Sequence, residues 1–276
     1  MGAKLVSVIV PTLNSDKTVS RCLSSVRTQQ FRPVELIVVD GGSQDRTIEL
    51  SNGLADTVIV GRSKRSTARR LGADVAQGDY LLFLDSDQVV SSDLLAECVA
   101  IVSRRVCEAV RIPESDSGFG IWFRCRELDR RIGLVDQLGY PRFISREAYF
   151  RAGQHSTDVQ DYLEDRDLYL RLLDAGVSMV WSRNRITNLM NHVNPLEIGR
   201  KGSRAANDAD VFYRKWRTRG EGLRQVVFPR VRNVLNGGVI NGTNIVTLGL
   251  FPIYVLAAYG PRLLTTSIKR LVSRPR

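Results

Sequence analysis

The stretch YLLFLDSD, residues 80–87, joins an unbroken apolar run to two carboxylates one residue apart. Residues 80–84 have the continuous apolar character of a strand buried on both faces, as in a parallel sheet covered by helices. Asp85 and Asp87 follow directly at the end of that strand. Ligands of open α/β sheets bind beyond the carboxyl ends of the strands. The stretch therefore predicts a buried strand that carries two carboxylates to a ligand site, the alternative being an ordinary Asp/Ser turn.

Similar apolar runs lie on both sides of this strand and are separated by segments of helical period. Between the first two runs, Val19, Cys22, Leu23 and Val26 recur at the spacing of one helix face. The runs are LVSVIVP (5–11), VELIVVD (34–40), DTVIV (56–60) and CEAVRIP (107–113). This alternation predicts an α/β fold in which helices sandwich a mostly parallel sheet.

Composition limits the kind of protein and the kind of partner. The chain has 276 residues, 43% of them hydrophobic, and a formal charge of +11, which suits a globular domain with anionic partners. Its four cysteines are far apart and in apolar surroundings, which indicates packed thiols in a reducing compartment. The first residues run straight into a strand-like segment without a signal-peptide core. We therefore expect a cytoplasmic location.

Three segments together resemble the family 2 glycosyltransferases of the GT-A fold. They are VSVIVPTLNSDKTVSRCLSSVRTQQFRPVELIVVDGGSQDRT (6–47), STARRLGADVAQGDYLLFLDSD (66–87) and YLEDRDLYLRLLDAG (162–176). The resemblance covers roughly residues 5–181. It implies an inverting, metal-dependent transfer of a sugar from a nucleoside diphosphate sugar to an acceptor, with the DxD motif binding the metal that holds the diphosphate.

The resemblance also implies a set of donor-binding residues. Three positions depart from the family pattern: Leu13 stands where the family often has Tyr, Arg70 replaces Asn, and Gly41 replaces a second acidic residue. Because that acidic residue contacts the base in some members, the identity of the nucleotide base stays open. Asp40 has the alternative role of a turn or helix-capping carboxylate. The basic residues around Arg69 have the alternative of a solvated face or a nucleic-acid patch, but they lack interleaved aromatics, so we expect no nucleic acid. The donor-binding set is Pro11, Thr12, Asn14, Asp40, Ser43, Arg69, Asp85 and Ser86.

The expected cofactor is a divalent cation, Mg²⁺ or Mn²⁺. Magnesium needs only one or two carboxylates when a diphosphate and water complete its shell. Asp85 and Asp87 are the predicted ligands, and the resemblance adds His192, whose alternative is a surface loop histidine.

The segment LEDRDLYLRLLDAG (163–176) supplies candidates for the base that an attacking hydroxyl needs. On a helix, Asp165 continues the apolar stripe of Leu168 and Leu172 and so faces inward, whereas Asp167 and Arg171 are expected to form a solvated pair. Acidic residues in a first turn also complement the helix dipole, which is the alternative. The resemblance implies that Asp165 is the general base and that Glu164 orients the acceptor or the base.

The C-terminal part differs in character, because no charged residue occurs from Asn233 to Pro261 although arginines flank the stretch. Its apolar core is too short to span a bilayer, which predicts peripheral contact with the anionic inner face of the cell membrane. A homodimer interface or a core-covering helix pair is the alternative. We expect a catalytic domain over residues 1–220 and a basic, partly apolar extension over 221–276, with a glycan or lipid-linked acceptor.

Two other functions account for part of the sequence. A nucleotidyltransferase shares the sheet and the metal-bound diphosphate, but it requires a Gly-rich phosphate loop after the first strand, and VPTLNSDKT (10–18) has none. A non-catalytic basic protein that binds nucleotides or nucleic acid is disfavoured because the expected carboxylates are all present.

Overall fold

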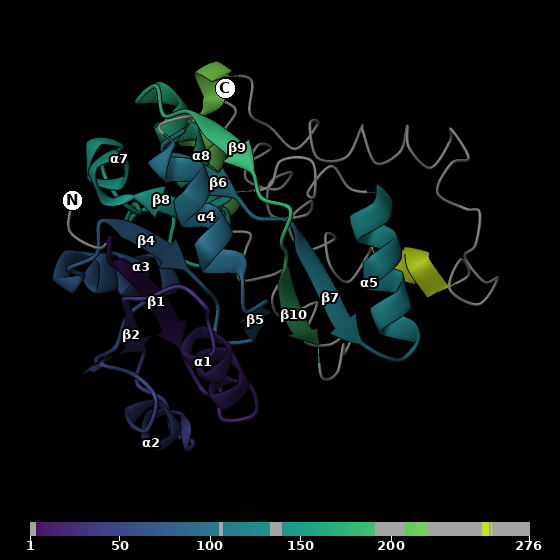
Figure 1. Ribbon diagram of the computed structural model, residues 1–276. Coiled ribbons are helices and arrows are strands. Elements are labelled where there is room, and N and C mark those ends of the chain that lie inside the picture. The colour runs from purple at the N-terminus through teal and green to yellow at the C-terminus, as the bar shows by residue number, and fades with distance from the viewer. Residues whose placement is uncertain are drawn as a thin grey trace. The chain divides into compact units, whose positions relative to one another are not determined.

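The computed structural model describes residues 4–104, 107–132, 140–190, 208–219, 250–253 and 255 (Figure 1). The chain divides into two compact units. The first comprises Met1–Ser115, Gly139–Gln160 and Glu164–Leu189, and the second comprises Asp116–Leu138, Asp161–Leu163 and Met190–Arg276. The predicted boundary between residues 220 and 221 lies outside the described residues. All the site residues described below belong to the first unit except His192, which falls in the second unit and outside the described residues.

The first unit is built on a seven-stranded, mostly parallel sheet, so the predicted fold class is confirmed. Its strands pair in parallel except β8, which is antiparallel to both β4 and β6. In spatial order they are β3 (Thr57–Val60), β2 (Val34–Asp40), β1 (Val6–Thr12), β4 (Tyr80–Phe83), β8 (Pro141–Ser145), β6 (Ala109–Arg111) and β9 (Met179–Trp181).

Helices cover both faces of this sheet, and successive strand residues alternate between the two cores. One core takes Val8 and Val10 of β1, whereas the other takes Ile9. The first face carries α1 (Val19–Arg27), α2 (Thr47–Asn52) and α4 (Leu94–Ser103), and the second carries α3 (Arg65–Val75), α7 (Arg146–Arg151) and α8 (Glu164–Asp174). The helix periodicity predicted for residues 19–26 is confirmed, because all four of its apolar residues are buried in α1.

A second, three-stranded sheet is formed by strands that follow the carboxyl ends of strands in the first sheet. It has the order β5-β10-β7, formed by β5 (Gln88–Val90), β10 (Ile186–Met190) and β7 (Glu114–Gly118). Because β5 starts directly after the DSD motif, the small sheet fixes the backbone that follows Asp85.

The second unit contributes α5 (Ile121–Ile132) and a short 3₁₀ helix at Arg217–Arg219. The predicted extension over 221–276 falls outside the described residues apart from positions 250–253 and 255. Within the described ranges, no helix is both long enough and apolar enough to cross a bilayer.

Helix α3 lies unusually close to β1, because Gly72 presents no side chain to the sheet. A Cβ added at Gly72 would lie 2.5 Å from Ile9 Cγ2 and 3.3 Å from Val39 Cγ2. Arg69 lies one turn earlier on the same helix. The close approach therefore helps to set the depth at which Arg69 enters the protein.

We expect Gly72→Ala to destabilise the fold although alanine is the better helix former. Overpacking against β1 costs about 1–3 kcal/mol, and the gain in helix propensity offsets about 1 kcal/mol of it. The matched control is Gly61→Ala, because a Cβ at Gly61 meets nothing within 4 Å. Urea unfolding of both variants measures the difference, and equal stability of the two would contradict the packing argument.

Candidate active site

Three segments of the first unit meet around the guanidinium of Arg69. Its Nη2 donates to Asp85 Oδ1 at 2.6 Å, and its Nη1 donates to Glu164 Oε1 at 3.3 Å and to Asp165 Oδ1. The Arg69 side chain is fully buried. The DSD motif after β4 and the first turn of α8, which are far apart in the sequence, are therefore joined by one side chain.

A second buried guanidinium, that of Arg142 on β8, joins the same carboxylates. Its Nη2 lies 2.8 Å from Glu114 Oε1 and 3.6 Å from Asp85 Oδ2, and its Nη1 lies 3.4 Å from Asp165 Oδ2. Sequence reasoning missed both Arg142 and Glu114. The available signal was the presence of a charged residue inside the strand-like run RFIS (142–145).

We call this group the ion-pair cluster. Arg65 completes it through a 3.4 Å pair with Glu164 Oε1. Its members are Asp85, Glu114, Glu164, Asp165, Arg65, Arg69 and Arg142. The cluster thus holds four carboxylates and three guanidiniums.

The carboxylates of this cluster differ in their affinity for protons. Burial alone would raise the pKa of Asp85, but Arg69 and Arg142 outweigh burial and hold that pKa well below its usual range. Asp165 behaves alike, because Arg142 and Arg69 lower its pKa against the effect of burial. Burial and the neighbouring Asp165 instead raise the pKa of Glu164 to about 7. At neutral pH, Asp165 is therefore ionised and Glu164 is partly protonated.

The predicted nucleoside-binding residues form a tightly hydrogen-bonded loop pair at the ends of β1 and β2. Asp40 is fully buried, and its Oδ1 accepts from the backbone N–H groups of Gly42 at 3.0 Å and Ser43 at 2.7 Å. Its Oδ2 accepts from the hydroxyls of Ser43 and Thr12, the latter at 2.9 Å. Asp40 thus organises this loop, and a direct contact between Asp40 and a nucleotide stays a prediction.

Asn14 connects the two loops. Its backbone N–H donates to Ser43 Oγ at 2.8 Å, and its Oδ1 accepts from the N–H of Gln44 at 2.9 Å. Its φ of 49° lies in the left-handed region, which asparagine tolerates better than most residues. Pro11, which is half-buried, lies at the same end of β1. These hydrogen bonds therefore fix the conformation of the PTLN segment (11–14), which lies at the edge of the sheet where the resemblance implies that the nucleoside binds.

The DSD loop is held by its backbone and by Ser86. Ser86 Oγ lies 2.8 Å from Ser15 Oγ, and the carbonyl of Asp87 accepts from the N–H of Leu189 at 2.6 Å. Asp85 N–H donates to Gln88 Oε1 at 2.9 Å. The loop is thus fixed both to Ser15, directly after the PTLN segment, and to β10.

The surroundings of Asp85 do not fit a direct metal ligand, because both of its oxygens already face guanidiniums. Within the described ranges, no group of three or more His, Cys, Asp or Glu side chains could hold a metal ion. Asp87 stays a predicted ligand, and His192 lies outside the described residues. A cation bound here would thus depend on the donor diphosphate for most of its ligands.

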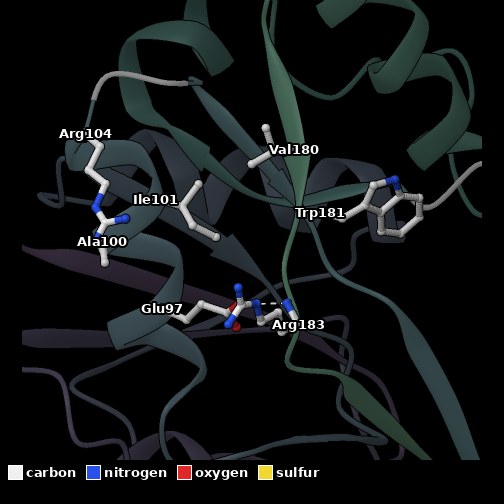
Figure 2. A pocket seen from close by; sticks show the side chains of 7 residues that line it. All are labelled: Glu97, Ala100, Ile101, Arg104, Val180, Trp181 and Arg183. Atoms are coloured by element: carbon white, nitrogen blue, oxygen red, sulfur yellow. Dashed lines mark hydrogen bonds between the residues drawn. The ribbon is translucent and has the colours of Figure 1, made fainter.

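A cavity of about 430 Å³ lies elsewhere, between α4 and β9 (Figure 2). Glu97 at its wall accepts from the backbone N–H of Arg183 at 2.7 Å. Its lining residues are Glu97, Ala100, Ile101, Arg104, Val180, Trp181 and Arg183. Because the cavity contains none of the predicted site residues, we place the active site at the ion-pair cluster.

The prediction for α8 was right about the apolar stripe and wrong about its charged pair. Leu168 and Leu172 are buried, and Gly176, with a φ of 68°, follows the end of the helix. Asp167 and Arg171 do pair, at 2.9 Å, but Asp167 is fully buried rather than solvated. The reason is that the segment after α7 covers this side of the helix, where Arg171 Nη1 donates to Ala152 O at 3.0 Å.

We expect Glu164→Gln to change how stability depends on pH. Glu164 is protonated in both states below its ordinary pKa of 4.5, but between 4.5 and about 7 only the unfolded chain ionises. The parent therefore loses stability as pH rises through this window, by about 3 kcal/mol at most. The glutamine variant lacks this loss, so its stability relative to the parent should increase from pH 4.5 to pH 8.

Urea unfolding across that pH range measures the difference. Glu147→Gln, at an exposed position on α7, serves as the control and should run parallel to the parent. A constant difference between Glu164→Gln and the parent would contradict the raised pKa.

Similar proteins of known sequence lie among bacterial glycosyltransferases. One, from Haemophilus influenzae (strain ATCC 51907 / DSM 11121 / KW20 / Rd), is an uncharacterized glycosyltransferase, 34% identical over 107 residues that make up 34% of this chain and 41% of the relative. Another, from Mycobacterium bovis (strain BCG / Pasteur 1173P2), is a PGL/p-HBAD biosynthesis glycosyltransferase, 36% identical over 110 residues, or 37% of this chain and 43% of the relative. The chain thus matches less than half the length of these relatives.

Solved structures share the fold at low sequence identity. A mannosyltransferase from Pyrobaculum calidifontis, solved with GDP-Man and Mn²⁺, gives a TM-score of 0.59 at 16% identity, covering 99% of this chain and 81% of its own. The structure of S. aureus TarS 1-349 gives a TM-score of 0.51 at 16% identity, covering 98% of this chain and 93% of its own. The sequence model of glycosyl transferase family 2 matches residues 7–160, a span that includes most of β1, Arg69, the DSD motif and Arg142. With the sheet, the DSD loop and this match in agreement, the chain belongs to glycosyl transferase family 2.

Proposed function

We propose that the chain transfers a sugar from a nucleoside diphosphate sugar to an acceptor hydroxyl or phosphate, with inversion at the anomeric carbon. The observation that carries the proposal is the joining of Asp85 and Asp165 by the two buried guanidiniums of Arg69 and Arg142. This arrangement brings a strand-end carboxylate and a candidate base to the same edge of the sheet. Family membership and the similarity to nucleotide-sugar-binding glycosyltransferases support it.

The donor would lie across the ends of β1, β2 and β4. Pro11, Thr12 and Asn14 would border the nucleoside, and Asp40 and Ser43 would keep the loop beside it in shape. The diphosphate would then extend toward the DSD loop, where Ser86 contacts Ser15, the residue directly after the PTLN segment. Arg65, whose side chain is 45% exposed, is the cation of the cluster most open to a phosphate.

Asp165 would act as the general base. Its carboxylate keeps 20% of its surface exposed, and its lowered pKa keeps it ionised at neutral pH. It would take the acceptor proton while the acceptor oxygen forms a bond to the anomeric carbon, and the bond from that carbon to the diphosphate breaks in the same displacement. A single displacement inverts the configuration. Glu164, protonated in part near pH 7, would donate a hydrogen bond that orients the acceptor.

A divalent cation, Mg²⁺ or Mn²⁺, belongs to the proposal, with Asp87 as its ligand in the first unit. His192, the further ligand that the resemblance implies, lies outside the described residues. When bound, such an ion supplies positive charge to the diphosphate. Because Asp85 is already paired with arginines, we assign it to ordering Arg69 and Arg142 rather than to the ion.

The acceptor is proposed to be a glycan or a lipid-linked molecule. The apolar stretch from Asn233 to Pro261, with its basic flanks, supports peripheral contact with the inner face of the cell membrane. A homodimer formed through the same stretch is the alternative.

Donor class and metal dependence are tested together by calorimetry. We expect UDP-glucose, UDP-N-acetylglucosamine, GDP-mannose or dTDP-rhamnose to bind with Mg²⁺ or Mn²⁺ and to bind more weakly with EDTA. Asp87→Ala should reduce the affinity in the presence of metal to the level seen with EDTA. Equal affinity of Asp87→Ala and the parent would contradict the metal assignment.

Asp165→Asn tests the base. We expect a loss of about 10²–10⁴-fold in kcat with donor affinity unchanged, because the proton acceptor is removed and Asp165 is not assigned to the donor. The change also weakens the ion pairs of Asp165 with Arg69 and Arg142. Release of nucleoside diphosphate from the donor, with water as the acceptor, measures turnover without a known acceptor. Asp158→Asn makes the same chemical change at an exposed loop position and should retain full turnover. A fall of less than tenfold in Asp165→Asn would exclude it as the base.

A further inference from the structure

Arg142 reaches the ion-pair cluster through an irregularity in the sheet. Val110 pairs with Phe143 and Arg111 pairs with Pro141, so Arg142 is the extra residue of a β-bulge in β8. Bulges occur next to active sites, where they redirect a side chain. The Arg142 side chain is 7% exposed and lies among carboxylates from three other segments.

Two of its nitrogens are fixed by Glu114, and these contacts determine where the third points. Nε donates to Glu114 Oε1 at 3.1 Å and Nη2 donates to the same oxygen at 2.8 Å. Nη1, which is buried, makes no hydrogen bond within the described residues, and it faces Asp165 Oδ2 at 3.4 Å. The guanidinium therefore bridges Glu114 on one side and the pair Asp85 and Asp165 on the other.

Glu114 is in turn connected back to the DSD loop, which closes a ring of hydrogen bonds and ion pairs. Asn188 Nδ2 donates to Glu114 Oε2 at 3.4 Å, and Gln88 Nε2 donates to Asn188 Oδ1 at 2.8 Å. Gln88 Oε1 accepts from the N–H of Asp85 at 2.9 Å. The ring joins β8 to all three strands of the small sheet. It closes at Asp85, which lies 3.6 Å from Arg142.

We infer that Arg142 is a positioning residue for the transfer reaction: it spans Asp85 and Asp165 and fixes the distance between the donor side and the base. The inference rests on the proposed function. Arg142 is not assigned to contact the donor or the acceptor. It acts through Asp85, whose loop would lie beside the diphosphate, and through Asp165, whose proton transfer requires correct placement. A planar guanidinium suits this role because its fork reaches several carboxylates at once, which an ammonium group does not.

The test compares Arg142→Met, Arg142→Lys and Arg151→Met by donor turnover with water as the acceptor. Arg151 is the matched control, because it pairs with Glu108 at 2.7 Å on the exposed side of α7. We expect kcat of Arg142→Met to fall about 10²-fold, as for a misplacement of about 1 Å, with the donor KM within about threefold of the parent. Arg142→Lys should restore kcat only in part, and Arg151→Met should match the parent.

Two outcomes would overturn the inference. One is a kcat for Arg142→Met no lower than that for Arg151→Met. The other is a rise in donor KM as large as the fall in kcat, which would make Arg142 a donor-binding group. If Arg142→Met does not fold, the double variant Arg142→Met/Glu114→Gln removes the buried charge and its partner together, and the same kcat and KM criteria apply to it.

A measurement that needs no activity separates this inference from the proposed function. Urea unfolding of the parent, Arg142→Met, Asp165→Asn and the Arg142→Met/Asp165→Asn variant gives the coupling between the two side chains. We expect the loss caused by Arg142→Met to be smaller in the Asp165→Asn background than in the parent. Additive losses would overturn the inference even if the parent transfers sugar. Coupling without turnover from any donor would instead count against the proposed function alone.

Discussion

The burial of the Arg69 guanidinium is the constraint on which the site depends. An arginine without solvent exposure is stable only when carboxylates surround it, because an unpaired buried charge is far too costly. Arg69 meets this need with carboxylates from the strand-end loop after β4 and from the first turn of α8. The close packing of α3 on β1 at Gly72 places it within reach of both. Folding of the core therefore assembles the site.

The excess of carboxylates over guanidiniums in the ion-pair cluster helps to explain why its carboxylates differ in their pKa values. Four carboxylates share three guanidiniums, and the arginines closest to Asp85 and Asp165 keep those two ionised. Burial, and after it the neighbouring Asp165, raises the pKa of Glu164. A site that combines an ionised carboxylate with a partly protonated neighbour is suited to moving a proton near neutral pH.

Sequence reasoning predicted those parts of the fold that depend on local patterns. The strand over residues 34–40 and the buried face of α1 follow directly from continuous apolar character and helical spacing. Asp85 and Asp165 were found through motifs. Arg142 and Glu114 were not, because their contacts depend on the antiparallel placement of β8 and on a bulge, neither of which has a periodic signal. The burial of Asp167 was missed for a similar reason, since a distant segment covers it.

The direction of β8 also bears on how the protein could be altered. Because β6 is parallel to β9 and antiparallel to β8, β6 ends and β8 begins at the same edge of the sheet, the edge that carries Asp85. The chain between these strands leaves and re-enters the sheet at that edge. That connection contains Glu114, which pairs with Arg142, and β7 of the small sheet, so its first part belongs to the ion-pair cluster. From the end of β7 to the start of β8 the described part of the chain supplies no residue of the ion-pair cluster, so a change of length in that stretch would leave the composition of the cluster intact.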